Sequence, residues 1–212
     1  MKLLSMFFLA LVLLVPSLNV NARSYEAGKH YEVLPKPVVT RNKNKVEVVE
    51  VFWYGCSHCF AFEPMVSAWK AKLPAYADFH QVPAMWNAPM KLHAQGFYVA
   101  KSLGMLDKIH QPFFSLLNVE KKRVNDKEAL AAFFARFGVD KATFDKTFNS
   151  FGVTSQLSLA ESRAASYRIQ GTPEMIVNGK YRISSSMAGS QAGMLDVASF
   201  LIEKEQAALP KQ

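Results

Sequence analysis

The chain has 212 residues, half of them hydrophobic, so it can bury the core of one or two domains without disulfide cross-links. Its formal net charge is +8 at pH 7, but the lysines and arginines are scattered, and Lys121-Lys122-Arg123 is the only dense basic triplet. The charge therefore favours a solvated surface, and we expect no nucleic-acid partner.

The first 22 residues have the three parts of a secretory signal peptide. Lys2 precedes an apolar run from Leu3 to Val15, and Pro16 and the small-residue ending Val20-Asn21-Ala22 follow. The run is shorter than the roughly 20 residues that span a bilayer, although an uncleaved membrane anchor is the alternative. We predict export and a soluble mature protein that begins at Arg23.

The first predicted element after this segment is a central strand. Val46 to Tyr54 is rich in β-branched and aromatic residues, and Gly55 ends it. Apolar residues then recur at helical spacing up to Leu73-Pro74, which predicts a helix. Ala77 to Pro83 is predicted to be a second extended segment.

From about Asn87 to Arg168 the pattern indicates helices only, because alternation with a period of two is absent. We predict five helices. They contain Leu92 to Leu103, Leu106 to Leu117 with a bend or break at Pro112, a segment capped by Asn125 or Asp126 and stopped by Gly138, Thr143 to Phe148, and Thr154 to Arg168.

Extended structure returns after Gly171. Glu174 to Val177 and Lys180 to Ile183 flank Asn178-Gly179, a strong hairpin signal because both turn residues tolerate positive φ. Ser190 to Ala208 is predicted to close the chain as an amphipathic helix. A β-rich frame interrupted by helices is the resulting α/β plan.

The two cysteines, Cys56 and Cys59, are the residues that point to chemistry. A disulfide between them closes too short a ring to stabilise the fold much. Zinc requires further ligands at suitable spacing, and because the other histidines are scattered, we expect no metal site. Strand, Cys-x-x-Cys, helix and strand in succession indicate a redox motif.

At the start of a helix, Cys56 is predicted to be stabilised as a thiolate by backbone N–H groups and the helix dipole. His58 adds a donor or a positive charge nearby, unless it is an ordinary exposed turn histidine. Cys59, one turn further, is predicted to be the buried resolving thiol. A fall in the Cys56 pKa from about 8.5 to about 4 stabilises the reduced protein by roughly 4 kcal/mol at pH 7. This raises the reduction potential of the cysteine pair by on the order of 90 mV, which favours oxidation of other thiols.

Two further positions are candidate site residues. Glu50 lies on the predicted central strand, where a carboxylate is costly unless paired or protonated, and we predict that it accepts the proton of Cys59. The alternative is a surface acid on an edge strand. Thr172-Pro173 precedes a strand and is a candidate cis-proline loop facing Cys56, where the Thr172 backbone binds an extended substrate peptide; an ordinary proline at a strand start is the alternative.

These residues resemble a known family. The segment from Glu50 to Cys59, followed by Phe62-Glu63-Pro64, is similar to the active site of DsbA-type thiol:disulfide oxidoreductases. Gly171-Thr172-Pro173, with Val177-Asn178-Gly179-Lys180-Tyr181 after it, is similar to the cis-proline loop and hairpin of that family. Together with the helical stretch between them, the two motifs cover nearly all of the predicted mature chain.

The resemblance implies an α/β thioredoxin fold with an inserted all-helical domain. We place the thioredoxin-like domain at residues 23–84 and 160–212, and the helical domain at residues 85–159. It implies a monomeric periplasmic enzyme that oxidises reduced, unfolded secreted proteins through a mixed disulfide at Cys56 and is reoxidised by a membrane partner of the DsbB type. The cysteine pair is the only redox group expected, with no separate cofactor.

Three positions depart from the family pattern. Ser57 stands where proline is usual, Thr172 where many members have valine, and Phe79-His80-Gln81 lacks the lysine that pairs with the buried glutamate in some members. A disulfide isomerase or reductase on the same fold is one alternative function. Isomerases of this kind usually carry a dimerisation domain, for which residues 23–45 leave no room. The other alternative is a peptide-binding chaperone with an incidental cysteine pair.

Overall fold

The computed structural model describes residues 24–210, so the predicted signal peptide and the cleavage before Arg23 lie outside the described residues. A mixed five-stranded sheet forms the centre, in the order β1-β5-β4-β2-β3. Its members are β1 (Glu32–Val33), β2 (Val46–Phe52), β3 (Ala77–Pro83), β4 (Glu174–Val177) and β5 (Tyr181–Ser184). Only β2 and β3 are parallel; the other neighbouring pairs are antiparallel.

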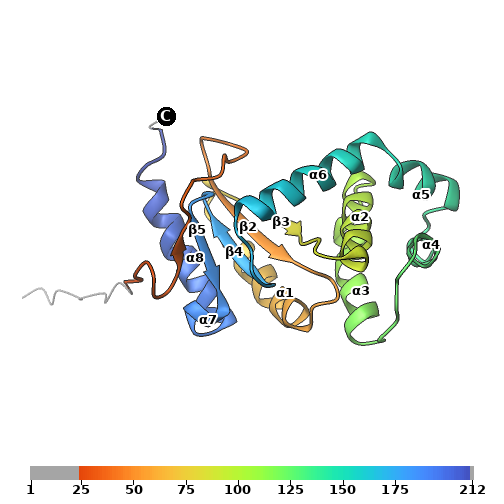
Figure 1. Cartoon of the computed structure of the whole chain (residues 1–212), viewed down its shortest axis with the longest axis horizontal. Helices are drawn as coiled ribbons and strands as arrows, with labels where there is room; N and C mark the ends of the chain where they lie inside the picture. Colours follow the sequence, from red (N-terminus) through yellow and green to blue (C-terminus); the bar gives the residue numbers. More distant parts are fainter. Residues whose placement is uncertain (1–23, 211–212) are drawn as a thin grey trace, which may run out of the picture.

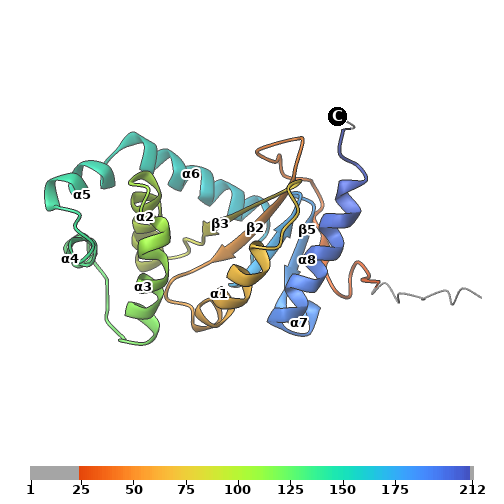
Figure 2. The same cartoon turned by 180° about the vertical axis from the view of Figure 1, so that it is seen from behind.

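Helices from both ends of the chain cover one face of this sheet, and the middle of the chain forms a helical unit beside it (Figures 1 and 2). The first group is α1 (Ser57–Lys70), α7 (Ser185–Ala188) and α8 (Gln191–Gln206). The second is α2 (Ala88–Ser102), α3 (Leu106–Asn118), α4 (Lys127–Ala135), α5 (Lys141–Phe148) and α6 (Phe151–Ser166). In the described residues, no helix is both long and apolar enough to cross a membrane.

Strand β2 is the centre of the packing. All seven of its residues are buried, as expected of a strand covered on both faces. Val46 and Val48 belong to the apolar cluster with α1 and α8, whereas Val49 and Val51 belong to the larger cluster with the helical unit. Side chains on the two faces of β2 therefore pack into the two apolar clusters. This packing holds the end of the strand at Phe52 in place, and with it the start of the segment that follows.

Most predicted elements are confirmed. β3 and β4 have the predicted bounds, and Asn178 and Gly179 have φ values of 51° and 61°, as the hairpin turn requires. Helix α3 runs through Pro112 without a break. Two short elements were not predicted, β1 and α7, because two or four residues carry too little periodicity to be recognised.

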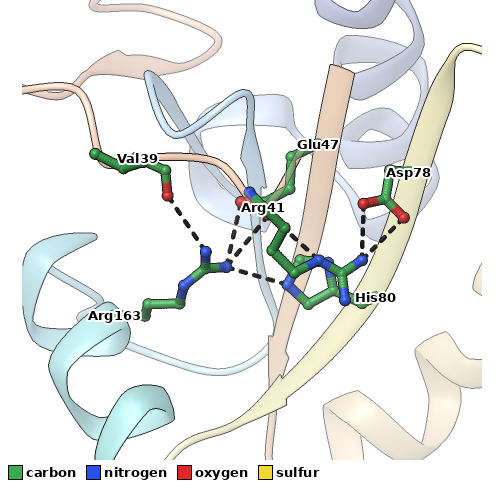
Figure 3. A network of polar contacts seen from close by, with 6 residues as sticks. All are labelled: Val39, Arg41, Glu47, Asp78, His80 and Arg163. Carbon is green, nitrogen blue, oxygen red and sulfur yellow. Dashed lines mark hydrogen bonds and ion pairs between the residues drawn. The ribbon is translucent and has the colours of Figure 1, made fainter. Parts of the chain in front are cut away.

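Helix α6 is continuous across residues 159 and 160, where we had placed a boundary between the two domains. It carries the chain from the helical unit back to the sheet (Figure 1). Near its end, Arg163 contacts the Glu47 carboxylate of β2 at 3.3 Å and donates to the Val39 carbonyl at 3.3 Å (Figure 3). Because Glu47 is almost fully buried, this contact ties the helix firmly to the sheet.

Candidate active site

Cys56 lies where β2 has ended and α1 begins, at the end of the central strand. It is the N-cap residue of α1, with extended backbone angles of φ −88° and ψ 116°. Its sulfur accepts a hydrogen bond of 3.4 Å from the backbone N–H of Cys59. An otherwise unpaired donor of the first helical turn therefore points at this sulfur, as the sequence predicted.

The surroundings of Cys56 favour the thiolate. They lower the pKa of its thiol from 9.0 to about 5, chiefly through a hydrogen bond from the Cys59 side chain, with smaller contributions from the Thr172 side chain and from the backbone N–H groups of Cys59 and His58. Partial burial acts in the opposite direction. At neutral pH the Cys56 sulfur is therefore an anion.

Cys59 has the opposite environment. It is fully buried, and burial raises the pKa of its thiol far above the ordinary value, with further contributions from the neighbouring Cys56 and the Glu50 charge. Both cysteines are free thiols in the structure. The pair thus consists of an accessible thiolate and a buried neutral thiol, which suits the attacked and the resolving positions of a redox pair.

His58 is exposed, and its backbone carbonyl accepts a hydrogen bond of 2.7 Å from the Gln191 side chain. Its backbone N–H contributes to the lowered pKa of Cys56. Within residues 24–210, no hydrogen bond of its imidazole is recorded, so the ring's predicted role as a donor or positive charge stays a prediction.

The loop before β4 faces Cys56, as its position in the sequence indicated. The Thr172–Pro173 peptide bond is cis. The Cys56 sulfur lies 3.3 Å from the Thr172 carbonyl oxygen, to which it donates a hydrogen bond in its protonated form, although 116 positions separate the two residues. A cavity of about 350 Å³ lies along the same loop and extends to Met187 of α7. The loop and the Cys56 sulfur are therefore direct neighbours.

Glu50 lies inside the fold, on β2 between β3 and β4, which rules out the alternative of a surface acid on an edge strand. Its side chain is fully buried and accepts a hydrogen bond of 2.8 Å from Gln81, its register partner on β3. Burial, followed by repulsion from Glu63, raises the pKa of the Glu50 carboxyl to about 8. Glu50 therefore holds a proton at neutral pH.

Polar side chains continue from Glu50 into the helical unit. The Gln81 amide also donates to Glu63 of α1 at 3.1 Å, and the same Glu63 oxygen lies 3.3 Å from His110 Nε2. His110 Nδ1 lies 2.7 Å from the Tyr54 hydroxyl. With Tyr54 as the donor to Nδ1, Nε2 carries the proton and lies near the Glu63 carboxylate, although Nε2 itself makes no hydrogen bond within the described residues.

Sequence reasoning missed Gln81, Glu63 and His110 as parts of this site. Glu63 lies within the family motif after Cys59, and Gln81 lies in the segment that lacks the lysine of some family members. The available signal was polarity within apolar stretches, since Glu63 and His110 stand on the buried faces of α1 and α3. Their meeting point depends on how three separate elements pack, which no local pattern reveals.

One group of side chains has the composition of a metal site. Ligand atoms of Glu47, Asp78 and His80 lie within 4.8 Å of one another. However, Arg41 binds both oxygens of Asp78 at 2.9 Å, and Arg163 binds Glu47 (Figure 3). The two guanidinium groups already neutralise these carboxylates, so the arrangement is a salt-bridge network.

Comparisons with known proteins agree with this geometry. The sequence profile of the DSBA-like thioredoxin domain matches residues 66–194. The thiol:disulfide interchange protein DsbA of Pseudomonas aeruginosa is 42% identical over 191 residues, covering 90% of this chain and 90% of that protein. The DsbA of Burkholderia cepacia is 34% identical over 206 residues, covering 97% of each.

Solved structures give the same result. The crystal structure of Pseudomonas aeruginosa DsbA superposes with a TM-score of 0.83 at 42% identity, covering 88% of this chain and 97% of that chain. The expected α/β thioredoxin fold with inserted helices is thereby confirmed. This chain belongs to the DsbA family and is a thiol:disulfide oxidoreductase that acts on protein disulfides.

Proposed function

We propose that the chain works as a dithiol oxidase, which gives its Cys56–Cys59 disulfide to reduced proteins as they fold. The observation that carries the proposal is the contrast between the two thiols. The pKa of Cys56 is lowered to about 5, whereas burial raises that of Cys59. A stabilised thiolate favours the reduced enzyme, and this makes its disulfide a strong oxidant.

The reaction proceeds in two exchanges. A client thiolate attacks the Cys56 sulfur, the bond between Cys56 and Cys59 breaks, and Cys59 leaves with the electron pair as a mixed disulfide forms. A second client thiolate then attacks the client sulfur of that bond, and Cys56 leaves as its stabilised thiolate. Two electrons pass from the client to the cysteine pair, and the client gains one disulfide.

In this proposal, Glu50 gives a proton to Cys59 or takes one from it. Because its pKa is about 8, it is protonated at neutral pH and can deliver its proton to the Cys59 sulfur as that sulfur leaves. In the reverse direction it accepts the Cys59 proton, as the sequence led us to expect. His58 and the Thr172-Pro173 loop complete the proposed site, with the Thr172 backbone holding the client as an extended chain.

We place this reaction in the periplasm, in agreement with the predicted signal peptide of residues 1–22. The proposed partners are reduced, unfolded secreted proteins and a membrane reoxidase of the DsbB type, and the enzyme is proposed to act as a monomer. The cysteine pair is proposed to be its whole redox group, with no metal or organic cofactor.

Equilibration of the mature protein with glutathione buffers tests the direction of electron flow. We expect a potential well above that of a reducing thioredoxin, which is about −270 mV. A potential at or below that value would refute the oxidase. Trapping tests the reactive sulfur: reduced Cys59→Ser should accumulate a mixed disulfide with a client that already contains a disulfide, because the Cys56 thiolate attacks that bond and no second enzyme thiol resolves the product, whereas Cys56→Ser should not. Full function in Cys56→Ser would instead favour the chaperone.

A further inference from the structure

A row of three cavities lies along α6, away from the active site. The largest, about 720 Å³, lies between residues 35–40 and α6. A second, of about 40 Å³, shares Leu159 and Arg163 with it. The third, about 210 Å³, shares Tyr98, Lys101 and Gln156 with the second. We call this row the α6 groove.

The α6 groove is lined by basic side chains and by no acidic one. Its cations are Lys36, Arg41, Lys101, Arg163 and Arg168. Two of them are neutralised by acidic side chains: Arg163 by Glu47 and Arg41 by Asp78 (Figure 3). Among the residues that the structure describes, the other three have no recorded ion-pair partner. The groove therefore carries uncompensated positive charge.

Three of the five cations of the groove meet at the smallest cavity. Arg41, Lys101 and Arg163 come from three different parts of the chain and meet around it. His80 also lines it, and its Nδ1 atom is buried without a hydrogen-bond partner. Burial, together with these three cations, lowers the pKa of His80 to about 3, so the ring is a neutral neighbour of the cations. Glu47 and Asp78 already bind Arg163 and Arg41, so Lys101 is the cation at this cavity that has no acidic partner among the described residues.

Apolar side chains accompany the charges. Val39 and Leu159 line the largest cavity and are 77% and 52% exposed, and Pro35 and Pro37 lie beside them. A site for a simple ion does not need such a surface, whereas an apolar side chain of a peptide can cover it. From Gly152 to Ser166 the lining follows one face of α6 for roughly 20 Å, which is about six residues of extended chain.

We propose that the α6 groove binds an extended polypeptide segment in which acidic and apolar side chains alternate, with one carboxylate paired with Lys101. Arg163 of the groove contacts Glu47 (Figure 3), which lies at the opposite end of β2 from Cys56, so the groove is separate from the site of disulfide exchange. It gives the enzyme a second contact with acidic proteins that does not involve cysteine.

The test uses the isotope-labelled mature protein and a six-residue, cysteine-free peptide that alternates glutamate with leucine or valine. Amide NMR shifts should change at residues 35–40, 98–102 and 152–166, and the affinity should fall as salt is raised. The same peptide with glutamine in place of glutamate should bind at least tenfold more weakly. Since no thiol is present, the result is independent of redox activity.

Variants locate the contact. Lys101→Gln should weaken binding about tenfold and Leu159→Ser at least threefold, whereas Lys91→Gln, an exposed lysine on the same helix as Lys101, should leave it unchanged. Thermal unfolding of each variant verifies folding. Equal binding of the glutamine peptide, shifts confined to the Thr172 loop, or saturation of the same shifts by acetate at the peptide's concentration would each overturn the proposal.

Discussion

The Gln81 side chain joins the buried carboxyl of Glu50 to that of Glu63, with hydrogen bonds of 2.8 and 3.1 Å from one amide nitrogen. Two carboxylates so close in a buried place cannot both be ionised cheaply, and the pKa of Glu50 rises to about 8. Glu50 is thus protonated at neutral pH. Replacing this residue should change both the stability of the protein and the rate of disulfide exchange.

Glu50→Gln should stabilise the reduced protein at pH 7. The folded-state pKa of Glu50 lies above the unfolded value of about 4.5, so its contribution is intact below pH 4.5 and is lost as the pH rises towards 8. At pH 7 this loss amounts to up to about 3 kcal/mol, which the variant avoids. Urea unfolding at pH 4 and pH 7 measures the difference.

The same variant should slow the formation and resolution of mixed disulfides, because Cys59 loses its proton partner. Stopped-flow fluorescence with a model peptide measures both rates. If Glu50→Gln exchanged disulfides at the rate of the unmodified protein, the role of Glu50 in proton transfer would be wrong, whatever the stability result.

Gln81→Leu should destabilise the fold by about 1–3 kcal/mol, because Glu50 and Glu63 lose a buried donor that they share. The loss should be smaller in a Glu50→Gln background, where one of the two acceptors has been changed. A double-mutant cycle from chemical denaturation gives the coupling. Gln156→Leu, a change at a glutamine in the α6 groove, is the control, and an equal loss there would contradict the prediction.

Alkylation of the reduced protein should report the Cys56 thiolate. The rate of reaction with iodoacetamide should rise with pH to a plateau, with a midpoint near pH 5. Because the Cys59 side chain contributes most to this shift, Cys59→Ser, which keeps a donor, should retain a low midpoint, and Cys59→Ala should move it upwards. Identical midpoints in the two variants would show that the helix terminus acts alone.

The lowered pKa of Cys56 also has a consequence for stability. A thiolate stabilised in the folded state contributes fully above its unfolded pKa near 9, and this contribution is lost as the pH falls to 5. The reduced protein should therefore lose stability relative to Cys56→Ser between pH 9 and pH 5. Parallel denaturant titrations of the two proteins measure the trend, and a constant difference would contradict it.

Arg163→Leu should cost about 2–4 kcal/mol, because the Glu47 carboxylate stays buried with only Arg41 beside it, at 3.5 Å. Glu47→Gln in the same protein should recover part of the loss by removing the unpaired charge. Thermal unfolding of the single and double variants measures both effects. A double variant less stable than Arg163→Leu would show that the charge at Glu47 is not the cause.

The sequence was sufficient where the signal was local. The β-branched run of β2, the Asn178-Gly179 turn and the cysteine spacing each specify their own geometry, and the structure follows them. β1 is different, since its two residues are extended only because they pair with β5, about 150 positions later. Such a strand forms only when the rest of the sheet is in place, so its own two residues show no sequence pattern that predicts it.

The candidate site divides in the same way. The position of Cys56 at the start of a helix predicted that its thiolate is stabilised. The Thr172-Pro173 sequence predicted a loop that faces this sulfur. The surroundings of Glu50 needed the register of β2 on β3, which sets Gln81 opposite, and the packing of α3, which brings in His110. The sequence placed Glu50 on the central strand, but a partner on another element follows only from three-dimensional packing.

Helix α6 determines how the helical unit is rotated relative to the sheet. An α-helix turns by about 100° per residue, so one inserted or deleted residue between Phe151 and Arg163 would swing the guanidinium away from Glu47 and rotate all that follows. The loop that begins at Gly171 would then no longer meet Cys56. We therefore expect homologous chains to vary in sequence along this helix far more readily than in its length.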